Sequence, residues 1–74
     1  MNPLIIYTIY DRPEDFPDKC VVRRHFIENG ESNPEFTVYA IGKEIEDVRR
    51  QLPVGLTCVG REVNDEAQIV ESWI

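Results

Sequence analysis

The chain has 74 residues, 42% of them hydrophobic, and its eight basic and fourteen acidic residues give a formal net charge of −6. This length predicts a single domain over residues 1–74, and the hydrophobic content excludes a disordered chain. The acidic balance argues against direct binding to nucleic acid or to an anionic membrane, whereas it allows docking onto a basic surface.

The sequence contains no stretch long enough to cross a bilayer. The apolar run Leu4 to Ile9 is too short for a secretory signal, and the residues before it are not basic. We therefore expect a cytoplasmic protein with reduced cysteines. Cys20 and Cys58 suit the role of small buried hydrophobic side chains in strands.

Hydrophobic patterning predicts strands in the first half of the chain. The run Leu4 to Tyr10 is rich in β-branched and aromatic residues, as in a strand covered on both faces. Prolines break the next segment, Asp11 to Lys19, and a second strand follows over Cys20 to Glu28. Asn29-Gly30 is a strong turn signal, but polar residues continue to Pro34. We therefore expect a longer connection and a third strand over Glu35 to Ile41.

The period then changes to that of a helix. Ile41, Ile45, Val48 and Leu52 are spaced by four, three and four residues, which places them on one helical face. Pro53 ends this helix. Two further strands are predicted, a short one over Leu56 to Val59 and a last one over 68–74.

The predicted order is β-β-β-α-β-β, which indicates an α+β fold. It would consist of a single antiparallel sheet of four to five strands with one helix packed on one face. The first and last strands are the most apolar, so we expect them near the centre of the sheet, where they could be neighbours.

Most of these strands carry apolar side chains on both faces, whereas one helix of about ten residues is only about 15 Å long and covers one face. An uncovered face with aromatic, aliphatic and arginine side chains is typical of a binding surface. The alternative is that long loops, above all Asp11 to Lys19, fold over that face.

The same loop is a second candidate for binding. Pro13 and Pro17 stiffen it, and its carboxylates are therefore held in place at little entropic cost. Phe16 would anchor the loop inward or contact a partner, and the Phe16-Pro17 bond could be cis. The alternative is a plain connector pinned by Phe16.

The residues for most kinds of catalysis are missing. Cys20 and the single histidine, His25, are five residues apart on one strand, so regular geometry places them on opposite faces; Cys58 with His25 stays open. No metal-ligand spacing and no phosphate-binding glycine loop is present. We expect no enzyme activity, no metal and no cofactor.

Several segments resemble small uncharacterised proteins of bacteria and their phages or prophages. They are YTIYDRP at 7–13, DFPD at 15–18, VVRR at 21–24, LPVGL at 52–56 and IVESWI at 69–74. The resemblance spans most of the chain and implies no activity. A phage setting implies that a small acidic protein could block a host protein, as anti-CRISPR and DNA-mimic proteins do.

The sequence thus favours a small acidic protein-binding module that docks on a basic surface of a host nucleic-acid-handling or defence complex. The alternative is a homodimeric structural or accessory protein whose uncovered face closes on its own copy. The residues predicted to bind a partner are Asp11, Arg12, Glu14, Asp15, Phe16, Arg23, His25, Tyr39 and Trp73.

Overall fold

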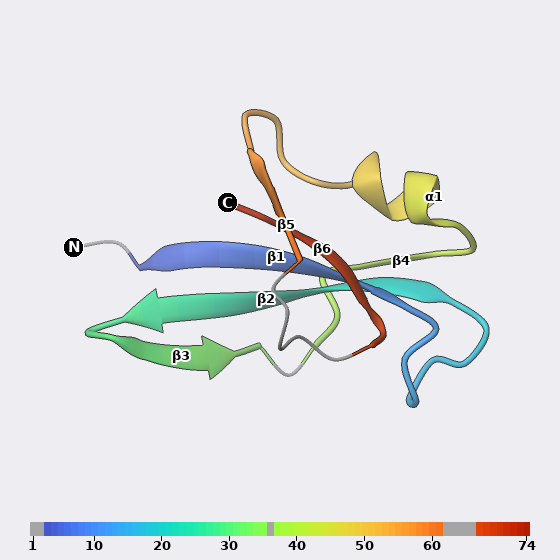
Figure 1. Cartoon of the computed structure of the whole chain (residues 1–74), viewed down its shortest axis with the longest axis horizontal. Coiled ribbons are helices and arrows are strands. Elements are labelled where there is room, and N and C mark those ends of the chain that lie inside the picture. Colours follow the sequence, from blue (N-terminus) through green and yellow to red (C-terminus); the bar gives the residue numbers. More distant parts are fainter. Residues whose placement is uncertain (1–2, 36, 62–66) are drawn as a thin grey trace.

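The computed structural model describes residues 3–35, 37–61 and 67–74, which form one antiparallel sheet with a short helix against it (Figure 1). The elements in chain order are β1 (Leu4–Asp11), β2 (Cys20–Glu28), β3 (Glu31–Pro34), β4 (Ala40–Gly42), α1 (Ile45–Arg49), β5 (Cys58–Gly60) and β6 (Ile69–Trp73). The strands are ordered β3-β2-β1-β6-β5, and β4 also pairs with β2. The predicted α+β class is confirmed, whereas the predicted count of four to five strands is too low, because the described residues form a sheet of six strands.

Strand β1 lies at the centre of the sheet. It pairs with β2 along its whole length, from Leu4 opposite Ile27 to Asp11 opposite Cys20. Its other edge pairs with β6, where Tyr7 lies opposite Trp73. The first and last strands are therefore neighbours, and their apolar composition reflects this central position.

The connection between β2 and β3 is shorter than the sequence suggested. Asn29 and Gly30 both have positive φ, 53° and 79°, and pairing resumes at once with Glu28 opposite Glu31. Positive φ at both central residues is the geometry of a two-residue hairpin turn. The polar residues after this turn are an exposed edge strand, which needs no apolar pattern.

Of the predicted third strand over Glu35 to Ile41, only Ala40 and Ile41 lie in a strand; Glu35 and residues 37–39 do not, and residue 36 lies outside the described residues. Strands β3 and β4 pair with opposite ends of β2, and the chain leaves the sheet between them. Two backbone hydrogen bonds frame this excursion, from Glu35 N–H to Arg24 carbonyl (2.9 Å) and from Tyr39 N–H to Val22 carbonyl (2.8 Å). Glu35 and Tyr39 are thereby placed beside the Arg24 side chain, with which both interact.

Helix α1 is shorter than the helix that the hydrophobic spacing from Ile41 to Leu52 predicts. Only Ile45–Arg49 is α-helical, and the chain continues in turns to Leu52. The carboxylate of Asp47 accepts a hydrogen bond from the Glu44 N–H (3.0 Å) and caps the first turn. The i,i+3 bond from the Leu52 N–H to the Arg49 carbonyl (3.2 Å) tightens the end before Pro53.

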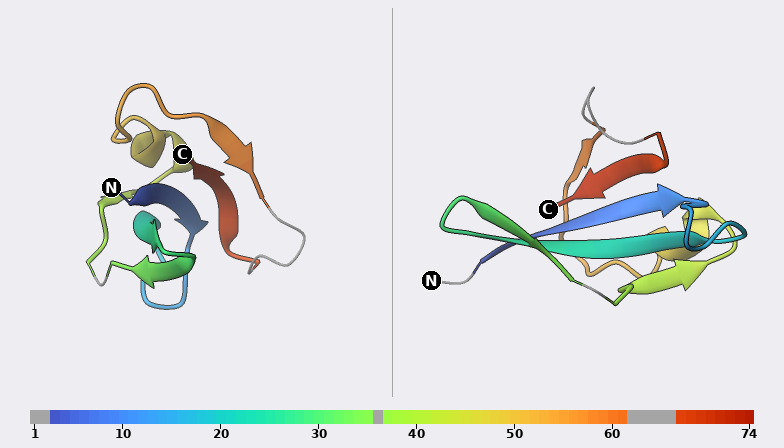
Figure 2. Two further views of the ribbon diagram at one scale, coloured as in Figure 1. Left: turned by 90° about the vertical axis from the view of Figure 1, so that its left-hand side faces the viewer. Right: turned by 90° about the horizontal axis from the view of Figure 1, so that it is seen from below.

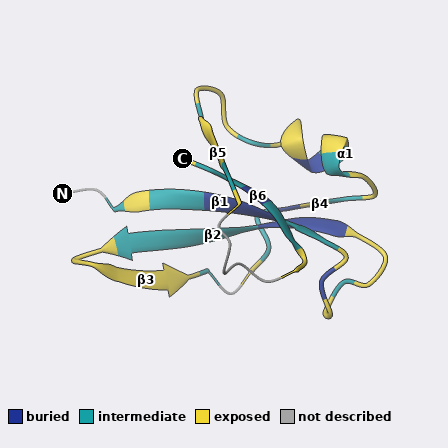
Figure 3. Cartoon of the chain, viewed as in Figure 1, coloured by how far each residue is buried: buried dark blue, intermediate teal, exposed yellow. Residues whose placement is uncertain are grey.

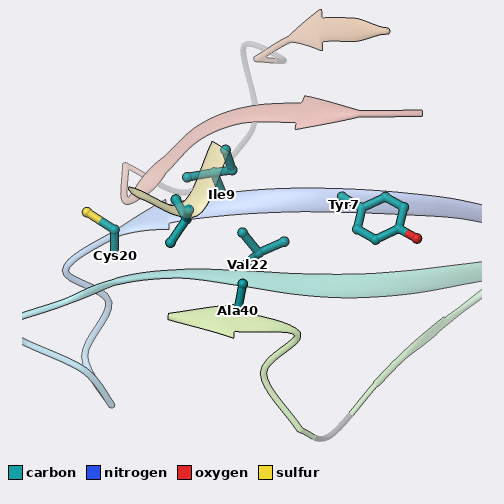
Figure 4. Close-up of a cluster of buried hydrophobic side chains, with 6 residues drawn as sticks. Tyr7, Ile9, Cys20, Val22 and Ala40 are labelled. Carbon is teal, nitrogen blue, oxygen red and sulfur yellow. The ribbon is translucent and has the colours of Figure 1, made fainter. Parts of the chain in front are cut away.

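The core lies between α1 and the facing side of β1, β2 and β4 (Figure 4). Ile9, Val22 and Val48 are fully buried there, and Cys20 is nearly so. Burial is deepest in the middle of β1 and at the start of β2, close to the helix (Figure 3). Partly buried side chains surround this centre: Ile5, Tyr39, Ile45, Leu52, Leu56, Val70 and Trp73.

Gly42 permits the close approach of α1 to β4. A Cβ added there would lie 2.7 Å from Asp47 Cβ and 3.3 Å from Val48 Cγ1. We expect Gly42→Ala to lower the free energy of unfolding by about 1–3 kcal/mol, because the helix must shift outward. Urea unfolding measures this change, and Lys43→Ala, at the exposed next residue, is the control. Equal stability of the two variants would contradict this packing.

Candidate functional site

The face of the sheet opposite α1, here called the helix-free face, is curved, and the described residues cover it only in part. Looking along the strands, β6 and β5 turn away from the plane of β1 and β2 (Figure 2). The curvature leaves a hollow of about 330 Å³, within the lower range of ligand pockets. Its lining is mainly apolar and consists of Ile6, Thr8, Tyr10, His25, Ser32, Val59, Gly60, Ile69, Ser72 and Ile74.

Strand register brings these residues together. Alternate residues of β1 point to the helix-free face, and their partners on the neighbouring strands point the same way. Ile6 lies opposite His25, and Thr8 lies opposite Ser72. The register of the β1–β6 pair shifts between Ile9 and Tyr10, at a β-bulge that bends the sheet. Among the described residues, the hollow therefore follows the curvature of the sheet.

The polar groups of the hollow are few. Thr8 Oγ1 and Ser72 Oγ form a hydrogen bond of 3.2 Å across β1 and β6. His25 is half-buried, and this burial, reinforced by the nearby Arg23 guanidinium, lowers the pKa of its imidazole. The hollow thus favours a neutral imidazole at pH 7 and presents a weakly polar surface.

The single histidine makes this environment directly measurable. We expect NMR titration of the His25 ring protons to give a pKa below 6.5. Because the pKa of His25 is lower in the folded state than in the unfolded state, its contribution to the free energy of unfolding is fully present above about pH 6.5. Its contribution is lost as the pH falls from there towards the folded pKa. A midpoint at or above 6.5 would show that the imidazole is solvated and that the hollow is not apolar.

The loop of residues 12–19 covers the other end of the helix-free face. Val21 points to this face and is fully buried, and Pro13 of the loop is also buried. A side-chain ion pair between Asp15 and Arg23 fastens the loop to β2. The sequence left two alternatives for this face, coverage by the loop or exposure. The loop covers the end of the face near Val21, and the hollow lies at the other end. The Phe16-Pro17 bond is trans.

A second, polar recess, here called the acidic notch, adjoins the hollow. It has a volume of about 400 Å³ and is lined by Tyr10, Pro13, Glu14, Asp15, Arg23 and Gln68. Tyr10 lines both recesses, so they are adjacent. Asp15 is paired with Arg23, whereas Glu14 is exposed and forms no ion pair among the described residues. The notch therefore carries two carboxylates and one guanidinium, a net negative charge.

The opposite face carries two ion pairs that aromatic side chains also contact. Arg24 donates to both carboxylate oxygens of Glu35, at 2.5 and 2.8 Å, and lies over the rings of Phe26 and Tyr39. Tyr39 in turn meets Tyr7 edge to face at 5.2 Å. These contacts raise the pKa of Arg24 and lower that of Glu35. Their role is to fix the excursion between β3 and β4.

The second ion pair joins α1 to β6. Arg49 donates to Glu71 at 3.2 and 2.6 Å, and the Trp73 indole N–H donates to the same carboxylate at 2.5 Å. Glu71 is buried, and the Arg49 guanidinium and the Trp73 N–H lower its pKa despite that burial. This carboxylate therefore connects helix and sheet.

The sequence-predicted binding residues do not form one surface. Glu14, Asp15, Arg23 and His25 lie on the helix-free face. Tyr39 and Trp73 pack against the core on the other side. Asp11 and Arg12 pair with each other at the end of β1, and Phe16 is half-buried within the loop. Sequence reasoning missed the apolar lining of the hollow, although strand alternation already grouped Ile6, Thr8 and Tyr10.

Neither cysteine meets the histidine. Cys20 points into the core, where its thiol contacts Asp11 Oδ1 (3.5 Å) and the Lys43 carbonyl (3.8 Å), and burial raises its pKa. Cys58 is exposed and lies opposite Trp73, on the face away from His25. Both thiols are free. Burial and the neighbouring Asp11 carboxylate therefore disfavour the thiolate form of Cys20.

Within the described residues, no three or more histidine, cysteine or acidic side chains converge as metal ligands. Those residues also contain no helix with the length and apolarity that crossing a bilayer requires. No protein-family model matches the chain, and neither the curated proteins nor the solved structures yield a match.

Proposed function

We propose that this chain is a protein-binding module without enzymatic activity, which docks through its helix-free face. The observation that carries the proposal is that an apolar hollow and an acidic notch lie side by side on one antiparallel sheet, with Tyr10 lining both. Exposed apolar patches bordered by polar residues typically mark protein-interaction surfaces or ligand-binding grooves. The thiol and imidazole environments described above support a binding role over a catalytic one.

We further propose that the partner presents a basic surface. The chain has a net charge of −6, and the notch adds local negative charge beside the hollow. Such charge accelerates association with a basic protein and weakens self-association of two acidic faces. By analogy with small acidic phage proteins, we propose that this partner belongs to a host nucleic-acid-handling or defence complex, which the module would inhibit by blocking its basic surface.

A capture experiment with three baits tests the proposal. The baits are the wild-type protein, Val59→Asp at the rim of the hollow, and Val54→Asp, a matched charge change at a fully exposed residue outside both recesses. We expect the wild-type and Val54→Asp baits to retain one basic protein from host lysate. The Val59→Asp bait should fail to retain it, and high salt should elute it from the other two baits. Equal capture by all three baits would contradict docking at this face. Light scattering tests the homodimer alternative, which predicts a dimer whose mass does not depend on concentration.

A further inference from the structure

The hollow and the acidic notch differ in chemistry but share one wall. Tyr10 of β1 lines both, with Ile6, Ile69 and Ile74 among the apolar groups on one side and Glu14 and Asp15 on the other. A ligand that fills both must therefore carry an apolar group and a positive charge a short distance apart.

We propose that the helix-free face binds an aromatic side chain of a partner protein in the hollow while a neighbouring lysine or arginine of the same partner enters the acidic notch. This inference rests on the proposed function and specifies the recognition element of the partner.

The size and lining of the hollow favour an aromatic anchor. Its volume of about 330 Å³ exceeds what a small aliphatic side chain fills. Aromatic side chains bury the largest apolar areas, and tryptophan and tyrosine are enriched among residues that dominate interface energetics. The neutral imidazole of His25 offers a flat surface against which a ring packs, and the Thr8 and Ser72 hydroxyls lie among the lining residues.

The negative charge of the acidic notch favours a basic residue next to the aromatic anchor of the partner. Asp15 is already neutralised by Arg23, so the carboxylate left for a partner is that of Glu14. An exposed pair of this kind contributes little affinity, and its main effect is on orientation and association rate. The anchor therefore supplies most of the binding energy, and the notch supplies the preference for a basic neighbour.

Peptide probes test the two halves separately. The probes are acetyl-Lys-Trp-Lys-amide, acetyl-Glu-Trp-Glu-amide, acetyl-Lys-Ala-Lys-amide and free indole, titrated into ¹⁵N-labelled protein and followed by NMR. We expect the Lys-Trp-Lys peptide to bind most tightly and to shift the amide signals of Ile6, His25 and Ser72. The Lys-Ala-Lys peptide is expected to bind at least about tenfold more weakly, because burial of the aromatic ring is lost.

Matched variants locate the contacts. Val59→Asp is expected to weaken the Lys-Trp-Lys complex at least about tenfold, and Val54→Asp to leave it unchanged. Glu14→Gln is expected to weaken the complex about two- to threefold and to reduce its salt dependence, whereas Glu28→Gln, an exposed carboxylate outside both recesses, is neutral. The spectrum of each free variant checks that it is folded.

Three results would overturn the inference. Indole binding as tightly as the Lys-Trp-Lys peptide would indicate a small-molecule site in place of a protein anchor. Equal affinity for the Glu-Trp-Glu peptide would remove the role of the notch. Shifts confined to residues outside the two recesses would place the contact elsewhere. If these tests fail while Val59→Asp still abolishes capture of a lysate protein, the docking face stands and only the identity of the anchor is wrong.

Discussion

We expect Ile9→Ala to unfold most of the protein at 25 °C. Ile9 is fully buried at the centre of the core, between its neighbours on β2 and β6. Truncation of a buried isoleucine lowers the free energy of unfolding by about 2–5 kcal/mol, because transfer energy is lost and a cavity remains. A domain of this size has only about 3–5 kcal/mol to lose. Urea unfolding of wild type and variant measures the difference.

The control for this prediction lies on the same strand. Leu4 is 51% exposed at the start of β1, so Leu4→Ala should change the free energy of unfolding by about 1 kcal/mol or less. A folded Ile9→Ala variant with the stability of Leu4→Ala would show that the core does not lie where the structure places it.

The second large effect is expected at Glu71. This buried carboxylate accepts hydrogen bonds from both Arg49 and Trp73. Glu71→Gln replaces one acceptor oxygen by a donor that faces other donors, so we expect a loss of about 1–3 kcal/mol in the free energy of unfolding. Glu46→Gln is a matched control, because Glu46 pairs with the same Arg49 at 2.5 Å but its side chain is 65% exposed. For Glu46→Gln, the decrease in the free energy of unfolding should stay below about 1 kcal/mol.

The pH dependence of stability provides a second readout for Glu71. Its pKa in the folded state is lowered, chiefly by Arg49, so its contribution to stability is fully present above about pH 4.5 and is lost as the pH falls through the folded pKa. The Glu71→Gln variant should therefore lose less stability than wild type as the pH falls below about 4.5. An unchanged acid slope in this variant would contradict the pairing.

The main features of the fold could be predicted because they depend on strong local patterns. The apolar run of β1 indicates a central strand, and the spacing of Ile45, Val48 and Leu52 locates the face of the helical turn that packs on the sheet. The edge strand β3 could not be predicted from its side chains. Its four exposed residues are held by backbone pairing with β2, which leaves no hydrophobic period.

The candidate site was predicted in part for a similar reason. Strand alternation assigns Thr8 and His25 to their faces, and the short helix packs on the other face of the sheet. The curvature that makes this face concave depends on the bulge beside Tyr10 and on how β5 pairs with β6. These are tertiary properties, which residue patterns do not reveal. Residue type alone likewise places Tyr39 and Trp73 on a binding surface, whereas in the structure they pack against the core.

Solvent relaxation enhancement by a neutral gadolinium chelate tests the openness of the helix-free face most directly. We predict strong relaxation of the His25 ring and Ile6 methyl protons, weak relaxation of the Val22 methyl protons, and the same contrast at low and high protein concentration. If His25 and Ile6 are as protected as Val22, the hollow is already filled by this chain or by a second copy. That result would contradict a free docking face.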